Sequence, residues 1–319
     1  MKKTSLSIIL GVAFSILVLV GVTTAYPNID DLWVENPFWN GLSTFYTDYQ
    51  PIRMNEFSEL DALYNPRNST LFIIGPYKEL TTSELTHLIG YLGRGGTLVL
   101  SDDFGTGNNI LESLEVEVRF DQRLLRDPVF REKNSYMPRA TANLAGIGYI
   151  VLNYPTVLTG VDSSIVSVWS SPLSYVSDND EISPSLFASY PVMTSVSVSG
   201  GRLIVLSDSS VFINSMLDKG ENKDLLDYLA RGTVVIDEAH SAQSRLSIVK
   251  SFLAKTIDAL GVYEIRYSLL FVILLGVSRL SLTGEETPVD PVEELMKRHP
   301  EYDRKQLEWL QAERKAQRK

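Results

Sequence analysis

The sequence predicts an α/β domain in which helices flank a mostly parallel sheet, with one transmembrane helix near each end of the chain. Three observations lead to this prediction. Strand-like and helix-like segments alternate through the body of the chain, a long uncharged run follows the amino terminus, and a second apolar run lies at residues 262–282. A length of 319 residues suffices for one large domain with appendages.

The first apolar run, Ser5–Val22, has 18 uncharged residues and follows Lys2 and Lys3. As a helix it would extend about 27 Å, at about 1.5 Å per residue, close to the ~30 Å hydrocarbon core of a bilayer. Residues 1–25 are therefore expected to form an uncleaved anchor. Cleavage after Thr23-Thr24-Ala25, as in a signal peptide, stays open as an alternative.

Residues 262–282 are expected to form a second transmembrane helix, in which Arg266 and Arg279 could reach opposite interfaces. Residues 26–264 contain 17 Lys and Arg against 30 Asp and Glu, whereas residues 295–319 contain 8 against 4. The positive-inside rule then places both termini in the cytoplasm. On this prediction residues 26–261 form an extracytoplasmic domain of a two-span cell-membrane protein, and residues 283–319 form a charged cytoplasmic tail.

The first part of the body has the pattern of a βαβ unit. The strand Thr70–Ile74 precedes Thr81 and Glu84, which have the spacing of a helix capping box, and the helix ends near Gly93. The strand Thr97–Ser101 follows. A crossover of this length predicts two parallel strands that are buried on both faces.

The later elements are less regular. A hairpin around Gly200-Gly201 is expected to join two strands. The other expected elements are short helices at Val211–Leu217 and Asn222–Leu229, a strand at Thr233–Ile236, and a helix at Ala239–Leu260. Residues 128–140 read as a loop, and residues 154–190 as short strands and loops.

Composition excludes several classes of protein. The chain has 44% hydrophobic and 21% charged residues, the balance of a globular protein. It contains no cysteine, so disulfides, thiolate metal sites and cysteine nucleophiles are excluded. Three scattered histidines do not predict a metal centre. A net charge of −10 argues against nucleic acid as a partner, because phosphate binding needs a cationic surface.

Acidic and hydroxyl side chains follow three of the predicted strands. Because the carboxyl ends of parallel strands meet at one edge of a sheet, we expect a candidate ligand crevice there. Its residues are Asp102, Asp103, Asp208, Ser209, Asp237, Glu238 and His240. Carboxylates that converge within ~5 Å could hold Mg²⁺ or Ca²⁺. Carboxylates turned to backbone N–H groups would instead be caps, the interpretation we favour, so no catalytic residue and no metal site is assigned.

Two short motifs resemble catalytic ones and are rejected. VVIDEAH (Val234–His240) has the letters of a helicase Asp-Glu-Ala-His box, but no phosphate-binding loop precedes it. Asp103-Phe104-Gly105 resembles the metal-binding triplet of kinases, but the catalytic-loop motif of kinases is absent. Asp237 and Glu238 are expected instead to cap the helix that follows their strand.

Three segments in order carry a family resemblance: GGTLVLSDDFGTGNNILESLEV (Gly95–Val116), GGRLIVLSDSSVFINSML (Gly200–Leu217) and VVIDEAH. They resemble the membrane-anchored family labelled domain of unknown function 4350. The resemblance implies a class I glutamine-amidotransferase-like fold, related to extracytoplasmic components of gliding-type ABC transporters. Amidotransferases of that fold need a cysteine nucleophile, which this chain lacks. Genes for MoxR-type AAA ATPases often lie beside those of the family, which implies a partner in assembly.

The sequence therefore favours a non-enzymatic, membrane-anchored, extracytoplasmic binding or assembly protein without a cofactor. Two alternatives stay open. One is a divalent-metal-dependent hydrolase that uses Asp102, Asp103, Asp208 and Asp237. The other is an auxiliary subunit of an ABC-type transporter.

Overall fold

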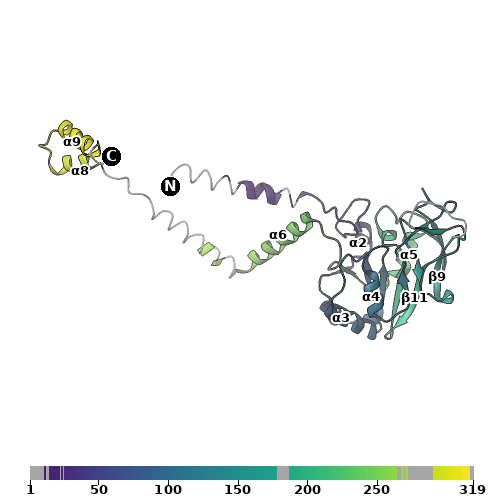
Figure 1. Cartoon of the computed structure of the whole chain (residues 1–319). Coiled ribbons are helices and arrows are strands. Elements are labelled where there is room, and N and C mark those ends of the chain that lie inside the picture. The colour runs from purple at the N-terminus through teal and green to yellow at the C-terminus, as the bar shows by residue number, and fades with distance from the viewer. Residues whose placement is uncertain are drawn as a thin grey trace. The chain divides into compact units, whose positions relative to one another are not determined.

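The structure is a computed structural model that describes residues 11, 14–21, 23, 25–177, 187–263, 267, 268, 270, 271 and 290–316. The chain divides into two units (Figure 1). One comprises Val22–Ser251, and the other comprises Met1–Gly21 with Phe252–Lys319.

A nine-stranded sheet forms the centre of the Val22–Ser251 unit. Its strand order is β1 (Ile52–Met54), β13 (Thr233–Asp237), β2 (Ser69–Ile74), β3 (Thr97–Ser101), β12 (Gly201–Leu206), β11 (Pro191–Val198), β9 (Val166–Ser170), β6 (Arg139–Leu144) and β7 (Ile147–Val151). The pairs from β1 to β12 are parallel, and those from β12 to β7 are antiparallel. The sheet is thus mixed, which corrects the prediction of a mostly parallel one.

Short helices and two small sheets complete this unit. The helices are α2 (Ser43–Tyr49), α3 (Thr82–Gly93), α4 (Gly107–Ser113), α5 (Asn222–Leu229) and the start of α6 (Arg245–Gly261). Single 3₁₀ turns lie at Phe57–Ala62, Pro66–Asn68, Ser163–Ile165 and Ser209–Phe212. The small sheets pair β4 (Arg119–Phe120) with β8 (Leu158–Thr159), and β5 (Leu124–Arg126) with β10 (Tyr175–Ser177).

The core has two parts, one on each face of the parallel strands. In β2, Phe72 and Ile74 belong to one hydrophobic cluster, whereas Leu71 and Ile73 belong to the other. All of β2 is buried. Burial on both faces is the arrangement expected of parallel strands, and it explains why this strand shows no apolar–polar alternation.

A buried tyrosine joins the beginnings of two of these strands. The Tyr91 hydroxyl lies 3.0 Å from the carbonyl oxygens of Ser69 and Thr97, and it accepts the Thr97 N–H at 3.2 Å. Gly96 faces the Tyr91 ring so closely that an added Cβ would lie 2.3 Å from a ring carbon. The side chain therefore fixes the start of β2 against the start of β3.

The strongest local predictions are confirmed. Thr81 and Glu84 form the capping box at the start of α3, and β2, α3 and β3 form the parallel βαβ unit. Strands β11 and β12 form the predicted hairpin. Its turn residues are Ser199 and Gly200, with φ of 53° and 98°, the backbone that a two-residue hairpin turn requires.

Two predicted elements differ from the structure. The helix expected from Ala239 begins only at Arg245, because residues 239–244 form turns and irregular backbone. The predicted helix Val211–Leu217 is a single 3₁₀ turn at Ser209–Phe212. Within residues 154–190, where short strands and loops were predicted, β9 is a full member of the large sheet.

Two side chains cover the edge of the sheet that β7 forms. Glu221 Oε2 accepts the N–H groups of Gly148 and Tyr149, at 2.5 and 2.9 Å. Asn222 accepts the Val151 N–H and donates to the Val151 carbonyl, both at 2.9 Å. The backbone groups that β7 would leave open are thereby satisfied.

The prediction of two membrane spans is corrected. Among the described residues, no helix is both long enough and apolar enough to cross a bilayer. The longest described helix, α6, has 17 residues, fewer than the ~20 that a transmembrane helix needs. Much of the predicted anchors and tail lies outside the described residues, namely residues 1–10, 12, 13, 22, 24, 264–266, 269, 272–289 and 317–319. The predicted topology, with residues 26–261 outside the cell and both termini in the cytoplasm, depended on these spans and is corrected with them.

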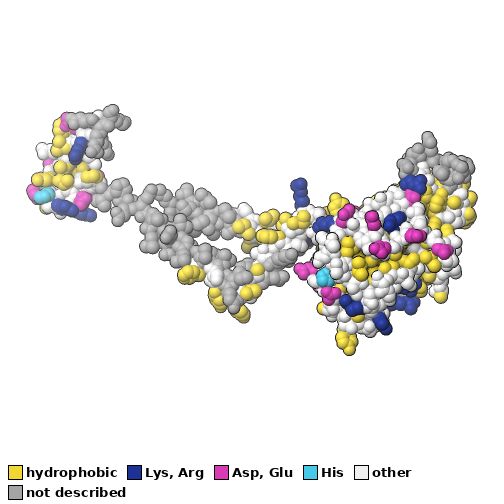
Figure 2. All heavy atoms as spheres, turned by 60° about the horizontal axis from the view of Figure 1, so that its bottom comes forward, with side chains coloured by type: hydrophobic (Ala, Val, Ile, Leu, Met, Phe, Trp, Pro, Cys, Tyr) yellow, Lys and Arg dark blue, Asp and Glu magenta, His cyan; other side chains and the backbone are white. Residues whose placement is uncertain are grey.

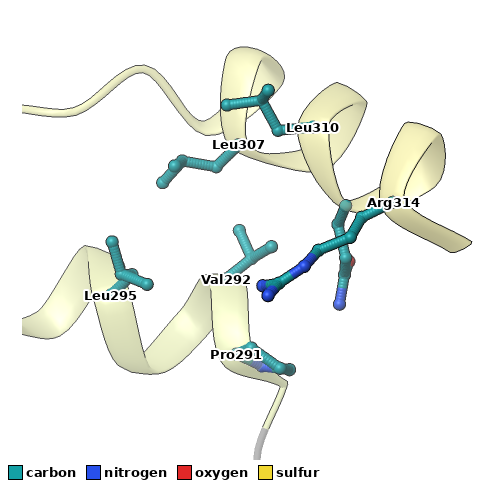
Figure 3. A pocket seen from close by; sticks show the side chains of 7 residues that line it. Pro291, Val292, Leu295, Leu307, Leu310 and Arg314 are labelled. Atoms are coloured by element: carbon teal, nitrogen blue, oxygen red, sulfur yellow. The ribbon is translucent and has the colours of Figure 1, made fainter.

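The described carboxy-terminal residues form a small helical hairpin. Helix α8 (Pro291–Arg298) is capped by Asp290, which accepts the Val292 N–H, and α9 (Arg304–Ala316) follows. The side chains of Val292, Leu295 and Leu307 extend into the space between the two helices (Figure 3). They line a hollow of about 410 Å³.

Candidate functional site

The predicted crevice residues do lie at the carboxyl ends of parallel strands, but they form two groups. Asp102 and Asp103 follow β3, and Asp208 and Ser209 follow β12, its neighbour. The second group lies at the end of β13, where Asp237 is the last residue of the strand and Glu238 and His240 follow it. Strand β2 lies between β13 and β3. The sheet order therefore separates the acids that the sequence suggested would meet.

Asp102 organises the loop between β3 and α4. Its Oδ1 accepts the N–H groups of Asp103 and Gly105 at 2.8 and 2.9 Å, and its Oδ2 accepts the Gly107 N–H at 2.7 Å. Burial raises the pKa of this carboxyl to about 6, although the three N–H groups favour the charged form. Gly105 and Gly107 fit here because a Cβ on either would lie within 2.7 Å of an Asp102 oxygen. Asp102 is thus a loop anchor.

Asp103 and Ser209 are brought together. The Ser209 hydroxyl donates to Asp103 Oδ2 at 3.1 Å, and the Phe104 N–H donates to Oδ1 at 2.8 Å. Burial raises the pKa of Asp103. This hydrogen bond ties the loop after β3 to the loop after β12.

Asp208 is fully buried and caps two loops. Its Oδ2 accepts the Asn153 N–H at 2.6 Å, and its Oδ1 accepts the Ser210 N–H at 2.8 Å. Burial, with the nearby charge of Asp103, raises the pKa of Asp208 well above its usual value. The contact with Asn153 could not be read from the sequence, because the two residues are 55 positions apart.

His240 lies between two carboxylates. Its Nδ1 is 2.9 Å from Asp237 Oδ2, and its Nε2 is 3.5 Å from Glu84 Oε2. The Phe57 ring packs edge-on against the imidazole, with 5.2 Å between ring centres. Burial acts to lower the pKa of His240, but the hydrogen bond and charge of Asp237, with the charge of Glu84, raise it. Glu84 shows in the sequence only as a capping residue, so this second role was missed.

Glu238 pairs with a residue of the first strand. Its Oε2 accepts from Arg53 Nε at 2.7 Å, and Arg53 also contacts Glu35. Glu238 Oε1 is buried without a hydrogen-bond partner, and burial raises the pKa of the carboxyl despite the arginine. Asp237 caps a turn, since its Oδ1 accepts the Ala239 N–H at 2.9 Å. The expectation that Asp237 and Glu238 cap a helix is therefore wrong.

The two groups do not form a metal-binding arrangement. In the ranges that the structure describes, no three His, Asp or Glu side chains are placed to hold a metal ion. By the geometric criterion stated above, Asp102, Asp208 and Asp237 are caps. Both oxygens of Asp102 and of Asp208 accept backbone N–H groups, whereas Asp237 accepts one with Oδ1 and faces His240 with Oδ2.

Comparison with protein families gives one match. Residues 35–230 match the family described as "Domain of unknown function (DUF4350)". The chain belongs to the DUF4350 family. The match spans α2 to α5, which includes Asp102, Asp103, Asp208 and Ser209, and it ends before Asp237. No curated protein matches the chain.

Solved structures show only low similarity to this DUF4350 protein. The mmIFT52 N-terminal domain is 16% identical with a TM-score of 0.42, over 54% of this chain and 77% of that one. A cytoplasmic protein from Salmonella typhimurium is 14% identical with a TM-score of 0.34, over 56% and 76%. A β-galactosidase from Bacillus circulans sp. alkalophilus is 9% identical with a TM-score of 0.32, over 52% and 23%. TM-scores this low carry no weight for function.

Proposed function

We propose that the α/β unit of this DUF4350 protein is a non-catalytic binding domain, for a ligand or for a protein partner. The observation that carries the proposal is the hydrogen bonding of the crevice carboxylates. Asp102 accepts three backbone N–H groups and Asp208 accepts two. A catalytic acid or metal ligand needs lone pairs that face a substrate or an ion, and these are directed into the protein's own loops.

The histidine supports the same proposal. A histidine that serves as a general base must be neutral and must face a nucleophile. Both ring nitrogens of His240 face carboxylates, which favour the protonated form. The proposal keeps the class I glutamine-amidotransferase-like fold that the family resemblance implies. It does not include amidotransferase activity, because that chemistry needs a cysteine nucleophile and the chain has no cysteine.

The test is thermal unfolding of the full chain with and without Mg²⁺ or Ca²⁺. We expect neither ion to change the midpoint, because an ion that binds only the folded state would raise it. Asp103→Asn and Asp208→Asn are compared with Asp218→Asn, whose side chain is 71% exposed. A saturable ion-dependent rise that the first two variants abolish and the third retains would overturn the proposal in favour of a metal-dependent hydrolase.

The partners implied by the family resemblance extend the proposal. A AAA ATPase-linked assembly or a transporter would require a protein-binding surface on this unit. Affinity purification of the full chain, with mass spectrometry of what co-purifies, would name candidates. Reconstitution of the complex from purified components would then test each one, and failure to reconstitute any would remove this extension.

A further inference from the structure

A groove on the antiparallel half of the sheet has the size of a small-molecule site. Its volume is about 460 Å³, and strands β6, β7 and β9 contribute to its floor. Ligand sites in proteins measure roughly 300–1,000 Å³. The groove is separate from the candidate crevice, since none of its lining residues belongs to that set.

The register of the sheet places three side chains in a row across this groove. Thr141 in β6 pairs with Tyr149 in β7 on one side and with Trp169 in β9 on the other. Strands in a sheet are ~4.8 Å apart, so the two aromatic residues are about 10 Å apart with Thr141 between them. Ala142 and Val168, which alternate with this row, are buried in the core. The row therefore lines the open face.

The cation in the groove already has partners. Arg139 Nη2 lies 2.6 Å from Glu132 Oε2, and its guanidinium carbon lies 5.4 Å from the centre of the Tyr149 ring. The hydrogen bond to Glu132 raises the pKa of Arg139, and the guanidinium is charged at neutral pH. With its charge balanced, and with a net charge of −10 on the chain, the groove favours a neutral occupant over an anion.

Several polar atoms in the groove are uncommitted. The side chains of Thr141, Tyr149, Trp169 and Ser189 make no hydrogen bond to other described residues, and all four line the groove. A purely apolar ligand would cover these donors and acceptors without satisfying them, which is costly. The occupant must therefore present an apolar face to the aromatic rings and hydrogen-bonding groups at its rim.

A sugar ring has this combination. In β-1,4-linked glucose or N-acetylglucosamine the ring substituents are equatorial, which leaves flat C–H faces and a rim of hydroxyl groups. We propose that the groove binds a neutral β-1,4-linked oligosaccharide, with one pyranose ring against Trp169 and its hydroxyls bonded to Thr141, Tyr149 and Ser189. This inference rests on the non-catalytic binding role proposed above and names its ligand.

The experiment titrates the full chain with cellotetraose and with chitotetraose in a calorimeter. Trp169→Ala is expected to weaken binding about tenfold or more, the effect of losing a central aromatic anchor. Trp39→Ala is the matched control, because Trp39 is 65% exposed and does not line the groove. It should leave the affinity within about twofold of wild type.

A second variant keeps the test decisive if Trp169→Ala does not fold. Thr141→Phe leaves both aromatic walls in place, fills the space between them and suits a strand. It should abolish binding while circular dichroism and the thermal midpoint confirm the fold. A proline-rich decapeptide is titrated in parallel, since aromatic grooves also bind such peptides.

Three results would overturn the inference: neither tetrasaccharide binds, binding survives in both folded groove variants, or the decapeptide binds in place of the sugars. Chromatography of the incubated sugars separates this failure from that of the proposed function. Cleaved tetrasaccharide would overturn the non-catalytic role. If the sugars stay intact and do not bind, and if divalent ions leave the thermal unfolding midpoints unchanged, only the oligosaccharide assignment is overturned.

Discussion

His240 Nδ1 lies 2.9 Å from Asp237 Oδ2, and both side chains are almost fully buried just after β13. The other ring nitrogen faces Glu84, which also caps α3. An imidazole between two carboxylates is more stable as the cation. The link between the loop after β13 and the first turn of α3 therefore depends on the protonation of one ring.

Asp237→Asn is expected to lower the free energy of unfolding by about 1–3 kcal/mol, because it leaves a buried imidazolium with a poorer partner. The raised pKa of His240 gives stability that is present below the unfolded-state pKa and is lost as pH rises through the folded-state pKa. The loss should therefore be larger at about pH 5.5 than at about pH 7.5. Urea denaturation at both pH values measures it.

The control for this variant is Asp218→Asn, on an exposed side chain. Its effect should stay within about 0.5 kcal/mol at either pH. Equal losses for Asp237→Asn at the two pH values would contradict a charged His240.

The whole protein is expected to be more stable at about pH 5.5 than at about pH 7.5. The pKa values of Asp102, Asp103, Asp208, Glu238 and His240 are all raised in the folded state, that of Asp102 to about 6. Over this window the folded state binds more protons than the unfolded chain, so unfolding free energy falls as pH rises. Carboxyl groups with a lowered pKa titrate below the window. Urea denaturation across this pH range, with the free energy of unfolding calculated from each midpoint and its denaturant slope, measures the change. A free energy of unfolding that rises toward pH 7.5 would contradict the prediction.

Asn222→Ala is expected to destabilise the fold by about 2–4 kcal/mol, because it leaves several buried polar groups unpaired. The amide bonds both backbone groups of Val151 and the carbonyl of Met216, and the residue is fully buried. Asn143→Ala, at an exposed position of β6, is the control. Chemical denaturation compares the two, and similar losses would show that Asn222 does not hold the edge of β7.

Tyr91→Phe removes only a hydroxyl, yet we expect a loss of about 1–3 kcal/mol, because buried backbone groups of Ser69 and Thr97 lose their partner. Hydrogen exchange should speed up at the Thr97 amide. Tyr64→Phe serves as the control, since Tyr64 is exposed. If exchange at Thr97 were unchanged, the tyrosine would stabilise by packing alone.

The parallel half of the sheet could be predicted because its signals are local. The capping box of Thr81 and Glu84 fixes the start of α3, which joins the parallel strands β2 and β3. In the antiparallel half the hairpin of β11 and β12 also has a local signal, the short turn at Ser199 and Gly200. The other antiparallel pairs could not be predicted. The strand Val166–Ser170 alternates Val with Ser and Trp, and its partner β6 precedes it by more than 20 residues. Such pairing depends on distant chain segments, for which the sequence gives no local signal.

The candidate site was predictable only in part for the same reason. That Asp102 caps a loop follows from its own neighbours, Gly105 and Gly107. In contrast, Asp208 bonds to Asn153, and His240 faces Glu84, and each of these partners is far away in the chain. The membrane spans rest on the lengths of two apolar runs and on the distribution of charge, and no described helix is both long enough and apolar enough to cross a bilayer.

The two side chains that close β7 also decide how copies of this protein can meet. An open strand edge is a template on which another chain can add a strand, and repeated addition builds fibrils. Glu221 and Asn222 occupy that template from within the same molecule. At this edge, growth by strand addition is blocked, even in crowded or concentrated conditions, so association there must use side chains rather than backbone.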